Sequence, residues 1–249
     1  MSSECVLVTG DAGAIGSATV DVFLDSGFTV VGLDRAERGV GRDADRHVRL
    51  HADVTDKGAV VEALECLEDA PPLTHVIAVA GGALPGEPIT QDDPTEIRLD
   101  DYLSSIELNL VSQFITVQAA LPWLRRARAA NKSIALTSSF NAISAQGMPG
   151  YSSAKAGLIG LMNSLVRPMG VEGVRINTVA PGTIRTPRTE RIWAHVPGHF
   201  ERLGNLSALG RVGEPADVAR VFRSLALDMT HVTGQVVVVD GGQLGRPGL

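Results

Sequence analysis

The chain has 249 residues, a formal net charge of -6 and 44% hydrophobic residues. This length suffices for one large α/β domain over residues 1–249. No basic stripe stands out in this acidic chain, which argues against a nucleic-acid surface. The sequence shows no apolar span of about eighteen residues and no charged leader before an apolar signal region, so we expect a soluble, cytoplasmic protein without membrane contact. The two cysteines, Cys5 and Cys66, indicate reduced thiols rather than a disulfide framework.

The amino terminus reads CVLVTGDAGAIGSATVDVFLDSGFTVVGLDRAE and has the outline of a nucleotide-binding unit. A short β-branched run is followed by a glycine-rich turn, an amphipathic helix and a second apolar run that ends at Asp34. Gly10 permits a sharp turn out of the strand, and Gly16 permits close approach of the helix to the sheet. Between them, the open helix end offers unpaired amides and a positive dipole to a pyrophosphate. The segment therefore predicts a dinucleotide site.

Asp34 also bears on the choice of cofactor. A carboxylate at the end of the second strand can accept hydrogen bonds from both ribose hydroxyls of NAD, whereas the extra phosphate of NADP meets a like charge there. Arg35 is the competing signal, because a guanidinium beside the acid can pair with that phosphate. We therefore expect NAD, with NADP as the less favoured alternative.

Strand and helix patterns alternate along the whole chain. This alternation predicts a three-layer, doubly wound α/β fold, in which helices cover both faces of a seven-stranded, mainly parallel sheet. The runs that predict strands are, in chain order, CVLVT, TVVGL, HVRLH, HVIAVA, SIALT, VRINTVA and QVVVVD.

Tyr151 and Lys155 lie four residues apart in a segment with helical spacing of its apolar residues. Side chains at i and i+4 are neighbours on a helix, so the Lys155 cation can stabilise a phenolate and lower the pKa of Tyr151 from about 10. A hydroxyl from Ser138 or Ser139, after the run SIALT, would hold a carbonyl or alcohol oxygen against that phenol. Taken alone, such Tyr and Lys pairs also arise on ordinary helices. Pro168 is expected to end this helix.

With both segments in view, the chain resembles the short-chain dehydrogenase/reductase family of the single-domain Rossmann type, over nearly its whole length. The family's TGxxxGxG is similar to TGDAGAIG here, with Ala14 in place of the middle glycine. The family's NNAG appears as AVAG, so Ala78 and Val79 replace two asparagines whose amides brace the central strands. This is the largest departure from the family pattern.

The resemblance also implies roles for individual residues. Asn109 resembles the asparagine that bends its helix and holds a water bonded to the lysine, which would complete a proton path from Tyr151. On its own, a helical asparagine is more often a packing or capping residue. Asp53 resembles the acid at the adenine amine. The implied cofactor contacts are Gly10, Ala12, Gly13, Ala14, Ile15, Gly16, Asp34, Arg35, Asp53, Val54, Ala80, Gly81, Gly82, Tyr151, Lys155, Pro181, Gly182, Ile184 and Thr186.

The position of the catalytic serine is left open by the sequence. The family's interval of thirteen residues before the tyrosine favours Ser138, while counting strand residues in SIALTSS favours Ser139. We lean to Ser138.

The expected function is NAD(H)-dependent interconversion of a secondary alcohol and a ketone, with Tyr151 as acid and base. Two alternatives are a non-catalytic dinucleotide-binding sensor or scaffold, and an epimerase or dehydratase with tightly held NAD. By resemblance we expect a homotetramer, or at least a homodimer, in which the helices around Asn109 to Trp123 and Tyr151 to Val166 pack on their symmetry mates. The expected ligand is a small-molecule alcohol or ketone.

Metal and hydrolase chemistry are not expected. His195 and His199 lie four apart, but Pro197 and Gly198 interrupt any helix between them. There is no GxSxG motif to present a nucleophilic serine. The region from about 187 to 209 is instead expected to form a flap over the substrate.

Overall fold

The structure is a computed structural model that describes residues 4–36, 43, 45–87, 93–144 and 147–244. Its centre is one sheet in the order β3-β2-β1-β4-β5-β6-β7, and each neighbouring pair of strands is parallel. The prediction of a doubly wound, seven-stranded Rossmann-type fold is confirmed. The strands are β1 (Cys5–Thr9), β2 (Thr29–Asp34), β3 (His47–His51), β4 (Leu73–Ala78), β5 (Lys132–Thr137), β6 (Val174–Pro181) and β7 (Val236–Val239).

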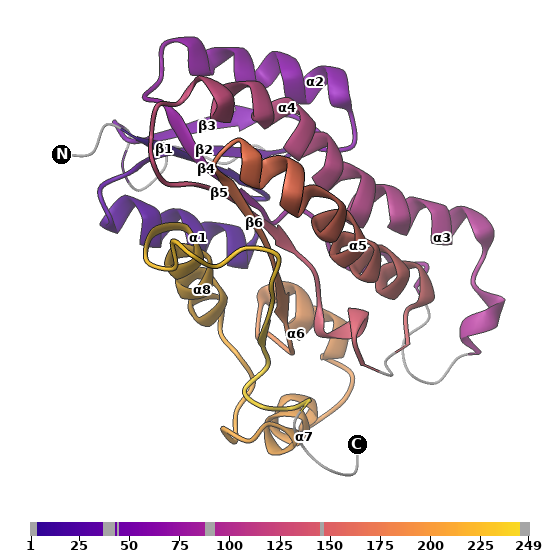
Figure 1. Ribbon diagram of the computed structural model, residues 1–249. Coiled ribbons are helices and arrows are strands. Elements are labelled where there is room, and N and C mark those ends of the chain that lie inside the picture. The colour runs from indigo at the N-terminus through magenta and orange to yellow at the C-terminus, as the bar shows by residue number, and fades with distance from the viewer. Residues whose placement is uncertain (1–3, 37–42, 44, 88–92, 145–146, 245–249) are drawn as a thin grey trace.

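Helices cover both faces of the sheet (Figure 1). α1 and α8 pack together on one face, while α2, α4 and α5 lie on the other. α6 and α7 lie apart from these two layers, beyond the ends of the central strands. The α-helices are α1 (Ala14–Asp25), α2 (Lys57–Ala63), α3 (Leu99–Ile106), α4 (Ser112–Arg126), α5 (Pro149–Val171), α6 (Pro187–Trp193), α7 (His199–Leu206) and α8 (Pro215–Leu227).

The sheet explains why its strands are so apolar in sequence. A parallel sheet with helices on both faces has no solvated side, so its central strands are continuous rather than alternating hydrophobic runs. All residues of β1, β4 and β5 are buried. One cluster of buried side chains lies between the sheet and α2, α4 and α5, and a second lies between the sheet and α1 and α8.

The strand order determines where a ligand can bind. The chain moves outward from β1 to β2 and β3 and then returns to β4 on the other side of β1. At such a reversal, the loops after the two central strands leave in opposite directions and open a crevice at the carboxyl ends of the strands. The loops after β1 and β4 carry the glycine-rich turn and the AVAG segment.

Two helices have irregular features near residues that the sequence analysis singled out. A five-residue π-helix, Glu107–Val111, joins α3 to α4 and contains Asn109. A single π-helical turn of this kind is a common place for a helix to bend, and the role that the resemblance gives Asn109 stays a prediction. The expectation that Pro168 ends its helix is wrong, because α5 continues to Val171. Pro168 lies so close to the carboxyl end that its missing N–H removes little of the helix.

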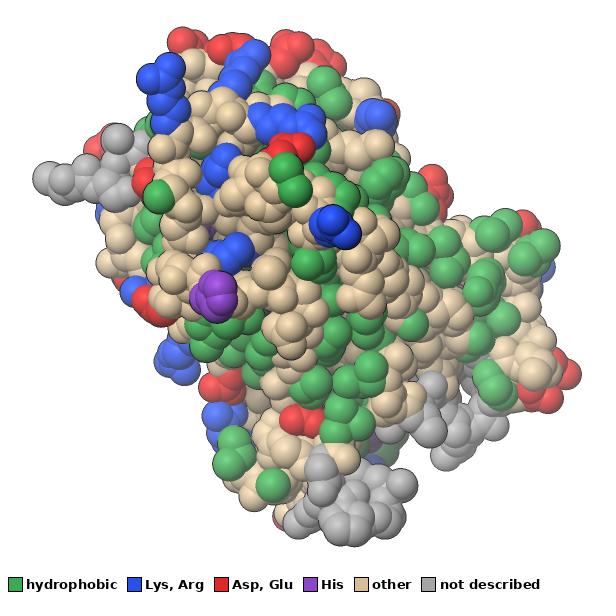
Figure 2. Space-filling model, viewed as in Figure 1, with side chains coloured by type: hydrophobic (Ala, Val, Ile, Leu, Met, Phe, Trp, Pro, Cys, Tyr) green, Lys and Arg blue, Asp and Glu red, His purple; other side chains and the backbone are tan. Residues whose placement is uncertain are grey.

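Hydrophobic side chains reach the surface over α5 and α3 (Figure 2). On α3 and α4 the exposed ones include Leu99, Leu103 and Phe114. On α5 the exposed positions are mostly small, among them Ala156 and Gly160. Within the described ranges, no helix is both long enough and apolar enough to cross a bilayer.

Candidate active site

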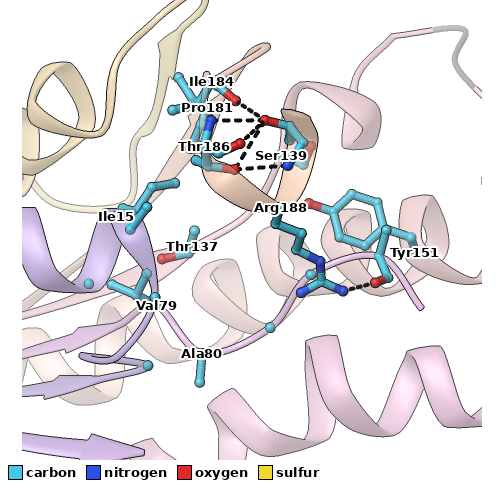
Figure 3. A pocket seen from close by; sticks show the side chains of 18 of the residues that line it. Ile15, Val79, Ala80, Thr137, Ser139, Tyr151, Pro181, Ile184, Thr186 and Arg188 are labelled. Carbon is cyan, nitrogen blue, oxygen red and sulfur yellow. Dashed lines mark hydrogen bonds between the residues drawn. The ribbon is translucent and has the colours of Figure 1, made fainter. Parts of the chain in front are cut away.

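A cleft with a volume of about 1110 Å³ opens at the carboxyl ends of the central strands. It is lined by residues from every segment in which the sequence placed a binding or catalytic group, and Figure 3 shows part of its wall. Of the residues predicted from sequence, all line the cleft except Asn109.

The glycine-rich turn has the shape that a dinucleotide phosphate requires. Gly10 has a φ of 72°, and a Cβ there would lie 2.8 Å from the Cα of Ala80. A Cβ on Gly16 would collide with the carbonyl oxygen of Gly10, so the helix start packs directly on the turn. Gly13 precedes the first helical residue, Ala14, and no side chain caps the helix. The open amino end of α1 therefore fits a pyrophosphate, and Ala14 is the first residue of this helix.

Asp34 supports this turn and also lines the cleft. Its Oδ2 accepts a hydrogen bond of 3.1 Å from the N–H of Ala12, and its Oδ1 accepts one of 2.9 Å from the N–H of Ala36. Arg35 is directed toward Asp53, with 3.8 Å between Nη1 and Oδ2. Asp53 also accepts two hydrogen bonds from Thr55, which hold its pKa below the usual range. This end of the cleft is thus rich in acidic groups.

Tyr151 lies in the first turn of α5, whose start is fixed by its surroundings. Met148, just before the helix, has a φ of 67°, the left-handed region that non-glycine residues seldom adopt. Pro149 follows at the first helical position. The backbone N–H of Tyr151 donates a 2.6 Å hydrogen bond to Oε1 of Glu87, a side chain only 3% exposed. A carboxylate at this point satisfies a free helix donor and suits the dipole.

Lys155 is buried one turn further along α5. Its Nζ donates a 2.8 Å hydrogen bond to the carbonyl of Thr137 and lies 5.5 Å from the centroid of the Tyr151 ring. Burial lowers the pKa of Lys155 to about 7. The Ser138 hydroxyl is also buried, and it donates a 2.7 Å hydrogen bond to the carbonyl of Lys155. Ser138 thus ties the end of β5 to α5.

Ser139, rather than Ser138, faces the phenol. Burial raises the pKa of Tyr151 above its usual value, a hydrogen bond from Ser139 and the charge of Arg188 oppose that rise, and the charge of Glu87 adds to it. The sequence predicts a phenol pKa lowered by Lys155. Burial of Tyr151 is instead the largest influence and raises this pKa, so the phenol stays protonated at neutral pH.

Asn109 lies behind the cleft, fully buried. Its Oδ1 accepts a 2.7 Å hydrogen bond from the N–H of Gly82, and its Nδ2 donates to the carbonyls of Gly82 and Ser105. A Cβ on Gly81 would lie 2.7 Å from this Oδ1 and 3.2 Å from Nζ of Lys155. Asn109 therefore fixes the loop after β4 next to the buried ammonium.

Hydroxyl groups brace the strand ends where the AVAG segment lacks two asparagines. Oγ1 of Thr137 donates a 2.6 Å hydrogen bond to the carbonyl of Ala78. The N–H of Ala80 donates to Oγ1 of Thr9 at 3.3 Å. The backbone of this segment thus has side-chain partners on both neighbouring strands.

The segment expected to form a flap contains α6 and α7, and both contribute side chains to the cleft. Thr186 caps α6 through its hydroxyl, which accepts from the N–H of Thr189 at 3.1 Å. The ring of His199 stacks on Trp193 with 3.9 Å between centroids, and His195 lies on the same indole at 6.5 Å. Among the described residues, no three His, Cys, Asp or Glu side chains form a group suited to a metal ion.

Two residues important to this geometry were missed in the sequence. Glu87 lies in a long, Pro-rich connection in which no spacing relates it to Tyr151, 64 positions away. Thr137 contributes through its carbonyl to Lys155, a contact that no side-chain pattern reports. Only the position of Thr137 at a strand end, directly before the two serines, could have drawn attention to it.

The fold is a Rossmann-type α/β fold, and its cleft has the form of a dinucleotide site. A family model described as enoyl-(acyl carrier protein) reductase matches residues 10–243. The chain belongs to the short-chain dehydrogenase/reductase family, as the sequence resemblance predicted.

Individual relatives agree with this assignment. The chain is 31% identical to the 3-oxoacyl-[acyl-carrier-protein] reductase FabG of Thermotoga maritima, over 97% of this chain and 98% of that protein. It is 32% identical to the L-fucose dehydrogenase of Bos taurus, over 97% of this chain and 89% of that protein. A short-chain dehydrogenase/reductase family oxidoreductase from Burkholderia thailandensis superposes with a TM-score of 0.87 at 32% identity, covering 99% and 94% of the two chains.

Proposed function

We propose that the protein is an NAD(H)-dependent oxidoreductase that interconverts a secondary alcohol and a ketone. The observation that carries the proposal is the convergence of Ser139, Tyr151 and Lys155 on one end of a cleft whose other end fits a dinucleotide. A bound nicotinamide would accept the hydride from the carbinol carbon or return it to the ketone carbon. In the oxidation direction the alcohol loses one hydride and one hydroxyl proton, and in reduction the ketone gains both.

Each residue then has a defined task. The Ser139 hydroxyl holds the substrate oxygen by a hydrogen bond, and Tyr151 exchanges the proton with that oxygen. The protonated phenol at neutral pH is the form needed to donate a proton to a ketone oxygen. Lys155, with a pKa of about 7, passes a proton onward or holds it near the ribose, while Asn109 keeps the adjoining loop in place.

NAD is the proposed cofactor, with NADP less favoured. Two features support this choice: the carboxylate of Asp34, at the end of β2, would repel a ribose phosphate, and the Arg35 guanidinium lies 3.8 Å from Asp53. The relatives include enzymes named for quite different substrates, so the family alone does not specify one.

We further propose a single domain with α6 and α7 as the substrate flap, and a cytoplasmic homotetramer. The exposed apolar residues Leu99, Leu103 and Phe114 and the small residues on the outer face of α5 support close contact with a symmetry mate.

Steady-state assays with NADH and a panel of ketones test the proposed reaction. Wild-type protein should consume NADH, and Tyr151→Phe should reduce kcat by about 100-fold or more with cofactor affinity nearly intact. NADH binding without turnover would identify a sensor, and substrate conversion without net cofactor change would identify an epimerase.

A further inference from the structure

Arg188 reaches from α6 into the substrate end of the cleft. Its guanidinium donates a hydrogen bond to the carbonyl of Ala83, and a Cβ on Gly82 would lie 2.5 Å from Nη1. The side chain lies beside the ring of Tyr151 (Figure 3), and its charge acts on that phenol. A cation therefore stands next to the position at which the proposed function requires the substrate oxygen.

The guanidinium has unused binding capacity. Arginine carries five N–H donors in a planar fork, and the structure gives this one a single backbone carbonyl as partner. Among the described residues, no Asp or Glu carboxylate lies within 4.0 Å of it in an ion pair. By contrast, Arg211 and Arg125 are each held by a carboxylate.

Charge is distributed unevenly along the cleft. The acids in its lining, Asp21, Asp34 and Asp53, belong to α1, to the end of β2 and to the segment after β3, around the dinucleotide end. One lining cation, Arg35, lies beside Asp53 at this same end, while Lys155, Arg188 and Arg191 belong to α5 and α6, at the other end. The carboxylate of Glu87 is also near this end, where it accepts from the N–H of Tyr151, but Glu87 does not line the cleft. The guanidinium of Arg188 is therefore a positive charge in the lining that favours an anionic ligand.

The remaining wall at this end is apolar. α6 and α7 contribute Ile192, Trp193, Leu203 and Leu206 to the lining. A cleft with apolar walls and one bidentate donor orients a ligand that has a carbon body and one carboxylate.

We propose that Arg188 binds a carboxylate of the substrate, so that the enzyme acts on hydroxy acids and the corresponding oxo acids. This inference rests on the proposed function and specifies its substrate class. The same cation could also serve a phosphate of the cofactor. Its neighbours Gly82, Ala83 and Tyr151 favour the substrate, because the glycine-rich turn and the open end of α1 lie elsewhere in the cleft.

The test compares acids with their neutral esters in the complete enzyme with NADH. The pairs are pyruvate, acetoacetate and levulinate, each against its methyl ester. Wild-type protein should prefer one of the acids. Arg188→Gln should lower kcat/KM for that acid by about 10- to 100-fold and change the value for its ester by less than about threefold. Arg202→Gln is the matched control, because Arg202 is a flap arginine outside the cleft lining whose guanidinium donates to the carbonyl of Pro197.

A binding measurement separates recognition from turnover. Quenching of tryptophan fluorescence by butyrate, a non-reducible analogue of acetoacetate, should be weakened by Arg188→Gln in the NADH complex and unchanged by Arg202→Gln. Equal use of acids and esters by wild-type protein would overturn the proposal while leaving the oxidoreductase function intact. A loss of NADH affinity of about tenfold in Arg188→Gln, with acids and esters affected alike, would assign the cation to the cofactor and also overturn it. Absence of turnover with these pairs and with neutral ketones would instead refute the proposed function.

Discussion

The carboxylate of Glu87 holds the backbone N–H of Tyr151 at 2.6 Å, so a buried acid fixes the first turn of the helix that carries the proposed acid and base. Its second oxygen, Oε2, has no hydrogen-bond partner among the described residues. The charge of Glu87 raises the pKa of Tyr151, whereas Arg188 and Ser139 lower it. Lys155 lies on the same helix, with its Nζ near the ring of Tyr151.

Glu87→Gln should therefore move the pH profile of alcohol oxidation toward lower pH. The amide oxygen can still accept from the N–H of Tyr151, but the negative charge that disfavours the phenolate is gone. The measurement is kcat/KM against pH for wild-type and variant protein. An unshifted profile would show that the acid acts only as a helix cap.

Glu87→Ala, compared with Glu87→Gln, separates the effect of the hydrogen-bond acceptor from that of the charge, because it removes both. This variant should lose about 1–2 kcal/mol of unfolding free energy, the usual effect of deleting a helix cap. Glu87→Gln should lose less. Urea denaturation of both variants provides the comparison.

Replacement of Ser138 and of Ser139 by alanine should have different effects on activity and stability. Ser139→Ala should lower kcat by about 100-fold or more, since it removes the donor that holds the substrate oxygen. Ser138→Ala should keep most of the activity but lower stability by about 1–2 kcal/mol, because the carbonyl of Lys155 loses its buried partner. Steady-state kinetics and thermal unfolding of both variants decide the assignment, and the opposite result would restore Ser138 as the catalytic residue.

Burial of Lys155 should give the protein a distinctive pH dependence of stability. The pKa is about 7 in the folded protein and near 10.4 in an unfolded chain. Between those values the unfolded state binds more protons, so folding stability rises with pH; below about pH 7 the full cost of the buried charge is present.

Lys155→Met removes that dependence. The unfolding free energy of this variant should exceed that of the wild-type protein most near pH 6. The difference should shrink toward pH 9.5, on a scale of about 1.4 kcal/mol per pKa unit. Urea denaturation at three pH values supplies the test, and turnover should be lost at all of them. A stability difference that does not vary with pH would mean that the ammonium is solvated in the folded protein.

Cofactor choice should depend on Asp34. Asp34→Ala removes the like charge from the ribose end of the cleft and should narrow the preference for NAD over NADP by about tenfold or more. The ratio of kcat/KM for the two cofactors measures this effect. A ratio equal to that of the wild-type protein would contradict the role given to this carboxylate.

Much of the architecture was predictable because it depends on local patterns. Most strands are compact apolar runs, and their alternation with helical segments indicated a parallel sheet covered on both faces. The glycine-rich turn between strand and helix is also a local pattern, and it indicated which end of the cleft is suited to the cofactor. The relation of Tyr151 to Lys155 follows from helix geometry alone.

Other features depend on tertiary contacts that spacing does not report. Ser138 and Ser139 differ by one residue, and only the exit geometry of β5 decides which hydroxyl turns toward the phenol. The raised pKa of Tyr151 arises from burial, which a helical pairing rule does not measure. Glu87 arrives from a connection that is distant in sequence from α5.

Met148 has a backbone conformation that is energetically unfavourable for a residue with a side chain. Its left-handed backbone suits glycine better than any residue with a side chain, at a difference of about 1 kcal/mol or more, yet a long thioether occupies the position and lines the cleft. Met148→Gly would relieve this backbone strain but would also remove a side chain from the wall of the cleft, so the backbone and the cleft favour different residues at this position.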